Sequence, residues 1–183
     1  MSDDNVQQVP SDEADKRQLE LAEAEGEAYQ RSLEYMVNEV AHTGAKKAVG
    51  DYIIGIAQEE AEGMYRPNAS GELVWQAPGE ENCHLEVAVC DGDDKRFVPG
   101  LSVKATLTSE SGERIGPFEV PFIWHPGLLH YGTNVKIPGS GKYDVTVHIA
   151  PAPFARHDKT NGKRYGEAVE VVFEKVDIEA GQE

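Results

Sequence analysis

The chain has 183 residues, enough for one domain with an extension, because single domains usually run to roughly 100–200 residues. It carries 33 acidic residues against 17 Lys and Arg, a formal net charge of -16, which excludes nucleic acid and anionic membranes as partners because both need a basic face. The acidic residues are spread along the chain, a pattern that keeps proteins soluble in concentrated salt by self-repulsion, so we expect a salt-loving source.

Export and membrane signals are not visible in the sequence. The first residues, MSDDNVQQVPSDEADK, contain neither a basic nor an apolar signal region, and no run of about 18 apolar residues follows. Cys83 and Cys90 flank a single predicted strand, so they lie too far apart to form a disulfide. Two free thiols fit a reducing compartment, and the sequence therefore predicts a cytoplasmic protein.

The N-terminal part is predicted to be a tail followed by a helix. Residues 1–15 are polar and acidic and are expected to be disordered, although Ser11 begins a capping pattern. Residues 16–46 are predicted to form an amphipathic helical extension that Gly26 weakens or divides. Its apolar residues recur at helical spacing: Tyr29, Leu33, Met36, Val37 and Val40. This stripe would pack on the rest of the chain, pair two protomers or bind another protein.

Residues 51–177 change to the alternating pattern of short strands separated by Pro and Gly turns, which predicts an all-β antiparallel sandwich. An acidic tail is expected at 178–183. Strands are expected at 52–57, 72–75, 84–90, 101–108, 119–124, 133–137, 143–149 and 168–176. Pairing of 133–137 with 143–149 around the Pro138-Gly139 turn would form a hairpin, and that hairpin would return the loop carrying His157 towards His130.

The histidines form the main candidate for a chemical site. In CHLEVAVC the alternation places His84 and Glu86 on one face of a strand, where they would share a metal or would form an exposed polar face with a cross-strand ion pair. His125 and His130 flank a sharp turn, and His157 lies in a Pro-rich loop. Imidazole and carboxylate ligands suit copper(II), zinc, nickel or iron(II), and the affinity order of divalent metals favours copper.

Several ordered motifs carry a family resemblance: His84-Leu85-Glu86, His130-Tyr131-Gly132 with Asn134 and Lys136, residues 141–149 (GKYDVTVHI), and Arg156-His157 with Asp158, Thr160 and Gly162. Over residues 51–176 the chain resembles the periplasmic copper-binding proteins associated with high-affinity ferrous iron transport, a family that includes the treponemal metal-binding lipoprotein. With its acidic composition it resembles a haloarchaeal member. The resemblance implies an immunoglobulin-like β-sandwich, commonly dimeric, that binds copper through His84, Glu86, His130 and His157.

The family's methionine ligand has no counterpart in the corresponding segment, which reads PFIWHPGLLHYG. His125 is the nearest substitute, and imidazole in place of a thioether favours a divalent ion over copper(I). The family works outside the cytoplasmic membrane, so the resemblance places the protein on the extracytoplasmic side.

We therefore predict a non-enzymatic protein that binds copper or iron, or alternatively zinc, through His84, Glu86, His130 and His157, with His125 as a fifth ligand. Its affinity should fall as the pH drops through about 6.5, the ordinary histidine value. A homodimer is expected, and a membrane iron permease or another protein would bind the N-terminal helix. The alternative is an immunoglobulin-like interaction module that has lost its metal; a redox enzyme is less favoured because no cofactor motif or acid–base pair is present.

Overall fold

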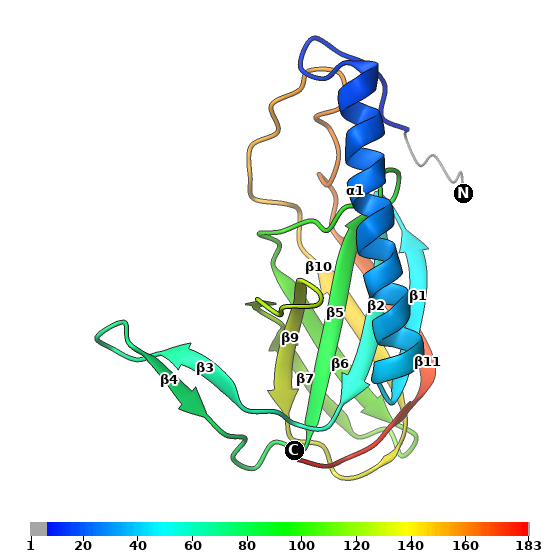
Figure 1. Ribbon diagram of the computed structural model, residues 1–183. Coiled ribbons are helices and arrows are strands. Elements are labelled where there is room, and N and C mark those ends of the chain that lie inside the picture. Colours follow the sequence, from blue (N-terminus) through cyan, green and yellow to red (C-terminus); the bar gives the residue numbers. More distant parts are fainter. Residues whose placement is uncertain (1–6, 183) are drawn as a thin grey trace.

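Two antiparallel sheets packed face to face form the body of the molecule in a computed structural model that describes residues 7–182 (Figure 1). One sheet has the strand order β1-β2-β5-β9-β8 and the other has the order β11-β10-β6-β7. The bounds of the first sheet are β1 Thr43–Val49, β2 Tyr52–Glu59, β5 Cys83–Asp91, β9 His130–Val135 and β8 Phe122–Ile123. Those of the second are β11 Val169–Ile178, β10 Gly141–Ile149, β6 Val103–Ser109 and β7 Arg114–Glu119.

The main core lies between the two sheets and follows the period-two alternation of the strands. In β10, Val145, Val147 and Ile149 are fully buried while the residues between them are more exposed, as expected for a strand with one wet face. They pack against inward residues of β5 such as Leu85 and Val87. The predicted immunoglobulin-like antiparallel sandwich with an N-terminal helical extension is confirmed.

Helix α1 (Lys16–Tyr35) begins with a capping box in which Asp15 accepts from the backbone of Gln18 and the Gln18 side chain accepts from Asp15 N. It continues through Gly26, so the expected division of the helix is wrong. A Cβ on Gly26 would lie 1.7 Å from the carbonyl oxygen of Asp94. The glycine is therefore present because the helix approaches the β5–β6 connection closely, and not to break the helix.

Helix α1, which carries the first part of the apolar stripe, lies over the outer face of the five-stranded sheet (Figure 1). Leu33 and Met36 are buried in a second, smaller core with Ala88 and Cys90 of β5 and with Leu128. The structure thus shows the first of the three predicted alternatives, in which the stripe packs on the chain's own sandwich.

The helical extension is shorter than predicted. After α1 a π-helical turn, η1 (Met36–Val40), ends the helix, and β1 begins at Thr43, so residues 43–46 are strand. Seven residues of β1 pair in register with β2, from Thr43 opposite Gln58 to Val49 opposite Tyr52. The sequence did not predict this strand, because the residues of β1, TGAKKAV, are half-buried or exposed and do not alternate between apolar and polar.

The two predicted tails are ordered over residues 7–15 and 178–182. Residues 1–6, which were predicted to be disordered, and residue 183 of the acidic tail lie outside the described residues. Residues 7–15 are tied to the body by hydrogen bonds such as Ser11 Oγ to Asp158 Oδ2 at 2.8 Å. At the other end β11 extends to Ile178, and the side chain of Gln182 donates to the carbonyl oxygens of Gly79 and Glu81. Polar side chains in both segments find acceptors on the sandwich, which composition alone does not reveal.

The expected hairpin between 133–137 and 143–149 is wrong. β9 pairs with β5 and β8, whereas β10 pairs with β6 and β11, so the Pro138-Gly139 turn carries the chain from one sheet to the other. Strand alternation is the same in both arrangements, because it records which residues face inward and not which strand is the neighbour.

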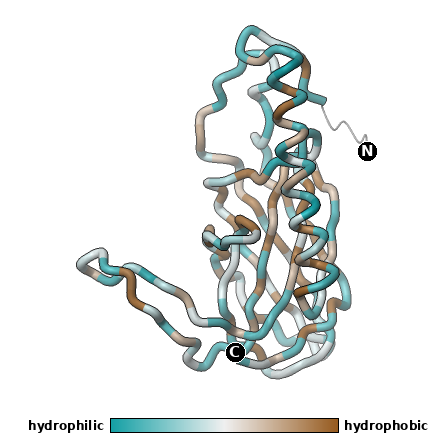
Figure 2. Tube along the Cα trace, viewed as in Figure 1, coloured by the Kyte–Doolittle hydropathy of each residue, from teal (hydrophilic) through white to brown (hydrophobic). Residues whose placement is uncertain are grey.

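A two-stranded arm, β3 (Met64–Pro67) and β4 (Leu73–Gln76), projects from the body (Figure 1). On one of its faces Tyr65 packs edge-on against Trp75 at a ring distance of 5.2 Å. Leu73 and Trp75 are 67% and 57% exposed, and Figure 2 shows an apolar stretch on this arm. An isolated hairpin is marginally stable in water, so this apolar face is a candidate contact surface.

Both cysteines are buried free thiols, in agreement with the spacing argument. Burial raises the pKa of each thiol to about 12, so neither is a thiolate at neutral pH. Among the described residues, no helix is both long and apolar enough to cross a membrane.

Candidate metal centre

Strand β5 places His84 and Glu86 side by side on the sheet face that lies away from the main core. The predicted alternation is correct, but the face is not exposed: His84 is 1% and Glu86 5% accessible. The second core under α1 and the segment around Leu128 cover this face. An exposed ion pair is therefore not what this motif forms, and two polar side chains are instead held in the interior, where they need compensating partners.

His130 joins the two β5 residues from the neighbouring strand. β9 runs antiparallel to β5, with Gly132 opposite Glu86 and Asn134 opposite His84. A Cβ on Gly132 would lie 3.0 Å from Nε2 of His84 and 3.2 Å from Cδ2 of His130. The glycine of the His-Tyr-Gly motif thus leaves the space in which both imidazoles approach the same point.

His84, Glu86 and His130 each offer one ligand atom, and these atoms lie within 4.8 Å of one another. Nε2 of His130 is 3.2 Å and Nε2 of His84 is 3.9 Å from Oε1 of Glu86. The two imidazoles meet the same carboxylate oxygen through the same kind of ring nitrogen, which is the arrangement of a site that a cation could bridge.

The tautomer of His84 is fixed by Asn134. Asn134 Nδ2 donates to the carbonyl oxygen of Glu62 at 2.7 Å, which turns its Oδ1 towards His84. Nδ1 of His84 lies 2.8 Å from that oxygen and must be the donor. Nε2 is then the nitrogen with the lone pair, directed towards Glu86.

His130 is held in the same tautomer by a backbone group. Its Nδ1 lies 2.9 Å from the carbonyl oxygen of Leu128 and therefore donates, so Nε2 carries the lone pair. Burial, followed by the charges of His84 and His125, lowers the pKa of His130 from 6.5 to about 4. The imidazole is neutral at pH 7, as a metal ligand must be.

Glu86 has the opposite shift. Burial, followed by the charges of Glu59 and Glu62, raises the pKa of its carboxyl from 4.5 to about 8. At neutral pH without metal the carboxyl holds a proton, which it can donate to Nε2 of His130. A cation that replaced this proton would restore the carboxylate as a ligand.

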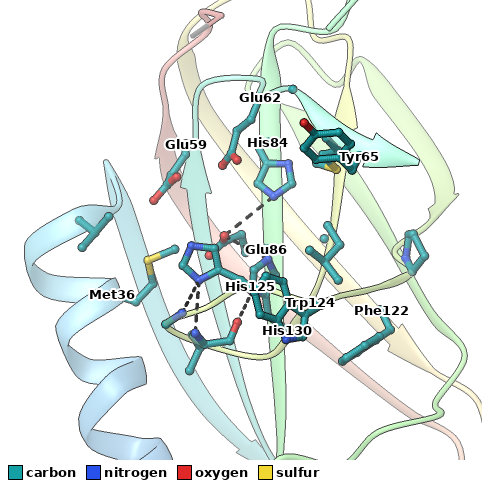
Figure 3. A pocket seen from close by; sticks show the side chains of 18 of the residues that line it. Met36, Glu59, Glu62, Tyr65, His84, Glu86, Phe122, Trp124, His125 and His130 are labelled. Carbon is teal, nitrogen blue, oxygen red and sulfur yellow. Dashed lines mark hydrogen bonds and ion pairs between the residues drawn. The ribbon is translucent and has the colours of Figure 1, made fainter. Parts of the chain in front are cut away.

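A pocket of about 1010 Å³ opens beside this group (Figure 3). In Figure 3, Glu86 lies between His84 and the pair His125 and His130, with Met36 on the side of α1. Glu59 and Glu62 also line the pocket, and each has a carboxylate oxygen within 4.8 Å of one on Glu86. Apolar residues of η1, the arm and the segment before β9 also line the pocket: Met36, Val40, Met64, Tyr65, Trp75, Phe122, Ile123, Trp124 and Leu128.

Glu59, Glu62 and Met36 are neighbours of the site that the sequence did not predict. Glu59 lies opposite His84 in the β2–β5 pairing, and only the strand register could have revealed this. Met36 reaches the pocket because α1 packs on the sheet, a long-range contact. Asn134 did carry a signal, since it belongs to the motif that follows His130.

His125 lies in the pocket but in the opposite tautomer. Its ring centroid is 5.9 Å from that of His130. Its Nδ1 accepts hydrogen bonds from the backbone nitrogens of Gly127 and Leu128 at 3.1 and 3.3 Å, so the neutral ring carries its proton on Nε2. The structure therefore does not bring His125 into the ligand group as it does His84 and His130.

His157 is not brought to the group within one chain. Its side chain is 94% exposed, and its Nδ1 lies 3.0 Å from Oε2 of Glu13. The loop between β10 and β11 lies beside the start of α1, at the end of the sandwich opposite to the start of β5 (Figure 1). Because β9 and β10 belong to different sheets, no hairpin returns this loop to His130.

These features define a β-sandwich with a buried histidine–glutamate group of the type that can hold a transition metal. Residues 34–178 match the family model described as Fe2+ transport protein. The match covers more than half of the chain, so the chain belongs to this family.

Curated relatives and solved structures agree with that assignment. A UPF0423 protein of Brucella abortus (strain 2308) is 33% identical over 112 residues, which cover 56% of this chain and 59% of the relative, so the chain spans only 59% of the relative's length. FetP of uropathogenic Escherichia coli strain F11 is 22% identical with a TM-score of 0.61, covering 74% of this chain and 94% of FetP. Copper-reconstituted P19 of Campylobacter jejuni is 18% identical with a TM-score of 0.62, covering 76% of this chain and 96% of P19. The two solved structures show that the fold is shared.

Two predictions gain no support from these relatives. They are bacterial, so a haloarchaeal source is not supported, and salt dependence stays a prediction. FetP was recombinantly expressed in the periplasm, so the predicted cytoplasmic location is not supported either.

Proposed function

We propose that this chain is a non-enzymatic transition-metal-binding protein of the iron transport system, with copper or iron as the metal and His84, Glu86 and His130 as the ligands that one chain supplies. The observation that carries the proposal is the buried group itself. Its three ligand atoms lie within 4.8 Å of one another, and the other ring nitrogen of each histidine is held by a hydrogen bond. Ligating histidines are usually oriented in this way.

Copper(II) is the first metal to test. Two imidazoles and a carboxylate suit copper(II), iron(II) and zinc, and copper has the highest affinity among these for a given nitrogen and oxygen site. Copper-bound structures are known for variants of FetP and P19, and the family is described by Fe2+ transport. We leave His125 out of the proposed ligands because its Nδ1 is occupied by backbone hydrogen bonds.

We further propose that His157 acts as a ligand to the metal of a second copy. The ligand group lies on the face of β5 near the start of that strand, and the loop of His157 lies at the opposite end of the sandwich (Figure 1). Two copies related by a twofold axis and packed antiparallel would bring each exposed imidazole to the partner's pocket. A homodimer would therefore complete both sites at once.

Isothermal titration of the apo protein with copper(II) tests the ligand assignment. The variants His84→Ala and His130→Ala should each lose tight binding, because removal of one imidazole leaves two ligands. His148→Ala, which removes a partly buried imidazole from β10, is the matched control and should bind like the wild type. Equal affinity of His130→Ala and wild type would contradict the proposal.

A mixing experiment tests the contribution of the second copy. In the antiparallel dimer, the His130→Ala homodimer and the His157→Ala homodimer each lack a complete site. A hybrid dimer has one complete site, because the His130→Ala chain lends its His157 to the intact group of the other chain. Tight copper binding should reappear when the two variants are unfolded, mixed and refolded together, and its absence would exclude the shared site.

The interaction module is the second candidate, and the exposed apolar residues around the pocket favour it. Tyr35, Tyr65, Leu73, Trp75 and Trp124 are each more than half exposed, and together they form a patch of the kind that marks protein contacts. A membrane iron permease or another protein would bind this patch, since the stripe of α1 is covered by the chain's own sheet. Loss of partner capture by Trp75→Ser, with copper binding unchanged, would support this function.

The family membership supports an extracytoplasmic place of action for this protein. Fractionation of cells that express the chain from its complete gene is the direct test. Recovery with the cytoplasmic fraction would contradict this part of the proposal.

A further inference from the structure

The N-terminal segment before α1, residues 7–15, forms a strap across the loop that carries His157. Its backbone at Val9 exchanges two hydrogen bonds with the side chain of Asn161, each of 3.0 Å. Ser11 Oγ donates to Asp158 at 2.8 Å. Gln8 fixes the other end of the strap, since its backbone and side chain donate to Asp93 and Asp94. The strap is thus hydrogen-bonded both to the loop that carries His157 and to the β5–β6 connection.

Glu13 is the strap residue that contacts the imidazole. Its Oε2 lies 3.0 Å from Nδ1 of His157. A carboxylate cannot donate, so in the neutral ring Nδ1 carries the proton and Nε2 carries the lone pair. The side chain of His157 is 94% exposed, which leaves this nitrogen accessible to a metal outside the chain.

Three histidines therefore share one design. Nδ1 of His84 is held by Asn134, Nδ1 of His130 by the carbonyl of Leu128, and Nδ1 of His157 by Glu13. In all of them Nε2 carries the lone pair of the neutral ring, whereas in His125 Nδ1 is the acceptor and the tautomer is reversed. A carboxylate that accepts from Nδ1 and so leaves Nε2 with the lone pair is a usual partner of a metal-ligating histidine.

We infer that the strap is part of the metal site of the partner copy, with Glu13 as the positioning residue that holds His157 in the ligand tautomer. The inference rests on the proposed role of His157 in a second copy, and it gives the N-terminal extension a function that the sandwich alone does not have. Carboxylates that orient ligating histidines typically contribute about 10–100-fold to metal affinity. Because this pair is exposed, we expect the lower end, about tenfold.

Copper(II) titration of the full chain tests the inference with four variants. Glu13→Ala removes the acceptor and should weaken copper binding about tenfold. Glu13→Gln keeps an oxygen that accepts from Nδ1 and should retain most of the affinity. Asp12→Ala removes a neighbouring strap carboxylate, and should bind like the wild type. His157→Ala removes the ligand itself, so its loss of copper affinity is the largest that any change at Glu13 should cause.

Nitrogen-15 NMR of the imidazoles measures the tautomer of His157 directly. This tautomer would not change if Glu13 only held the strap in place. In Glu13→Ala the population of His157 with its proton on Nδ1 should fall while the spectra of His84 and His130 remain unchanged. Wild-type affinity for Glu13→Ala, or equal losses for Glu13→Ala and Asp12→Ala, would overturn the inference alone. Wild-type affinity for His157→Ala would overturn both this inference and the shared site. The ligand group of His84, Glu86 and His130 is tested separately by the His130→Ala titration.

Discussion

Glu86 and His130 form a buried pair that is neutral at pH 7, because burial shifts the two pKa values in opposite directions. The carboxyl shifts up to about 8 and the imidazole down to about 4. The proton between Oε1 and Nε2, 3.2 Å apart, occupies the place that a metal would take. A metal held by the same two atoms would therefore compete with this proton.

The first consequence concerns the stability of the apo protein. An unfolded chain loses the Glu86 proton near pH 4.5, whereas the folded chain keeps it to about pH 8, so stability is present at low pH and is lost as the pH rises through this range. His130 is neutral in both states above pH 6.5 and adds nothing there. Between pH 6.5 and 8 we expect a loss of about 2 kcal/mol.

Urea unfolding of wild type and Glu86→Gln at these two pH values measures the effect. The amide cannot ionise, so the slope should disappear in Glu86→Gln. The same slope in both proteins would show that another group is responsible.

The affinity for copper should also depend on the Glu86 proton, but it should rise with pH where the stability of the apo protein falls. Binding must displace it, so affinity should rise about tenfold per pH unit up to about pH 8 and then level off. This differs from the expectation of a fall through 6.5, because His130 is already neutral there. Titrations between pH 6 and 9 in a buffer that does not bind copper would locate the break, and an affinity that stays constant between pH 7 and 8 would contradict the role of Glu86.

At the residue scale, the sequence predicted which side chains share a face but not how they are buried. His84, Glu86 and His130 were identified from alternation and motifs, and the structure brings them together. Burial of the β5 face depends on α1 and on the segment at Leu128, which are distant in sequence. The pKa shifts and the neighbours Glu59 and Glu62 follow from that burial, so no local pattern could have revealed them.

At the scale of elements, β5 has a core on each face. All nine of its residues are buried, with Leu85 and Val87 in the sandwich and Ala88 and Cys90 under α1. The helix thus covers the face of β5 that carries the candidate metal centre. Its distance from the sheet depends on Gly26, which lies against the backbone of Asp94.

Gly26→Ala should destabilise the protein despite the higher helix propensity of alanine. The propensity gain is about 1 kcal/mol, but a Cβ 1.7 Å from a backbone oxygen forces the helix away, and such overpacking costs about 1–3 kcal/mol. Thermal unfolding should show a lower midpoint. Gly139→Ala, where a Cβ meets nothing within 4 Å, is the control and should unfold like the wild type; equal midpoints for all three proteins would refute the close contact.

Elements with clear alternation were predictable and those defined by pairing were not. β10 was located to within two residues, since its buried and exposed residues alternate. β1 is nearly all polar or small and exists because it pairs with β2, and β3 exists because it pairs with β4. Which sheet receives the strand after Pro138 is likewise a property of the whole fold.

For the whole molecule, the charge of -16 opposes both compaction and association. Salt screens this repulsion, with a Debye length of about 10 Å at 0.1 M, so we expect unfolding midpoints to rise with potassium chloride. Denaturation curves at several salt concentrations measure this. Greater stability at low salt would contradict adaptation to salt.

Association and metal binding should be linked if His157 completes the partner's site. Two copies of an acidic chain repel each other, and a surface on which they can meet with less repulsion is the mainly apolar patch around the pocket, which includes Trp75 and Trp124. Copper that binds the dimer more tightly than the monomer must, by reciprocity, strengthen dimerisation by the same factor. Sedimentation velocity at micromolar protein should show a shift towards dimer on addition of copper(II) and its reversal by a chelator. His157→Ala should dimerise to the same extent with and without copper. A copper-induced shift towards dimer that persists in this variant would exclude the site shared between antiparallel copies.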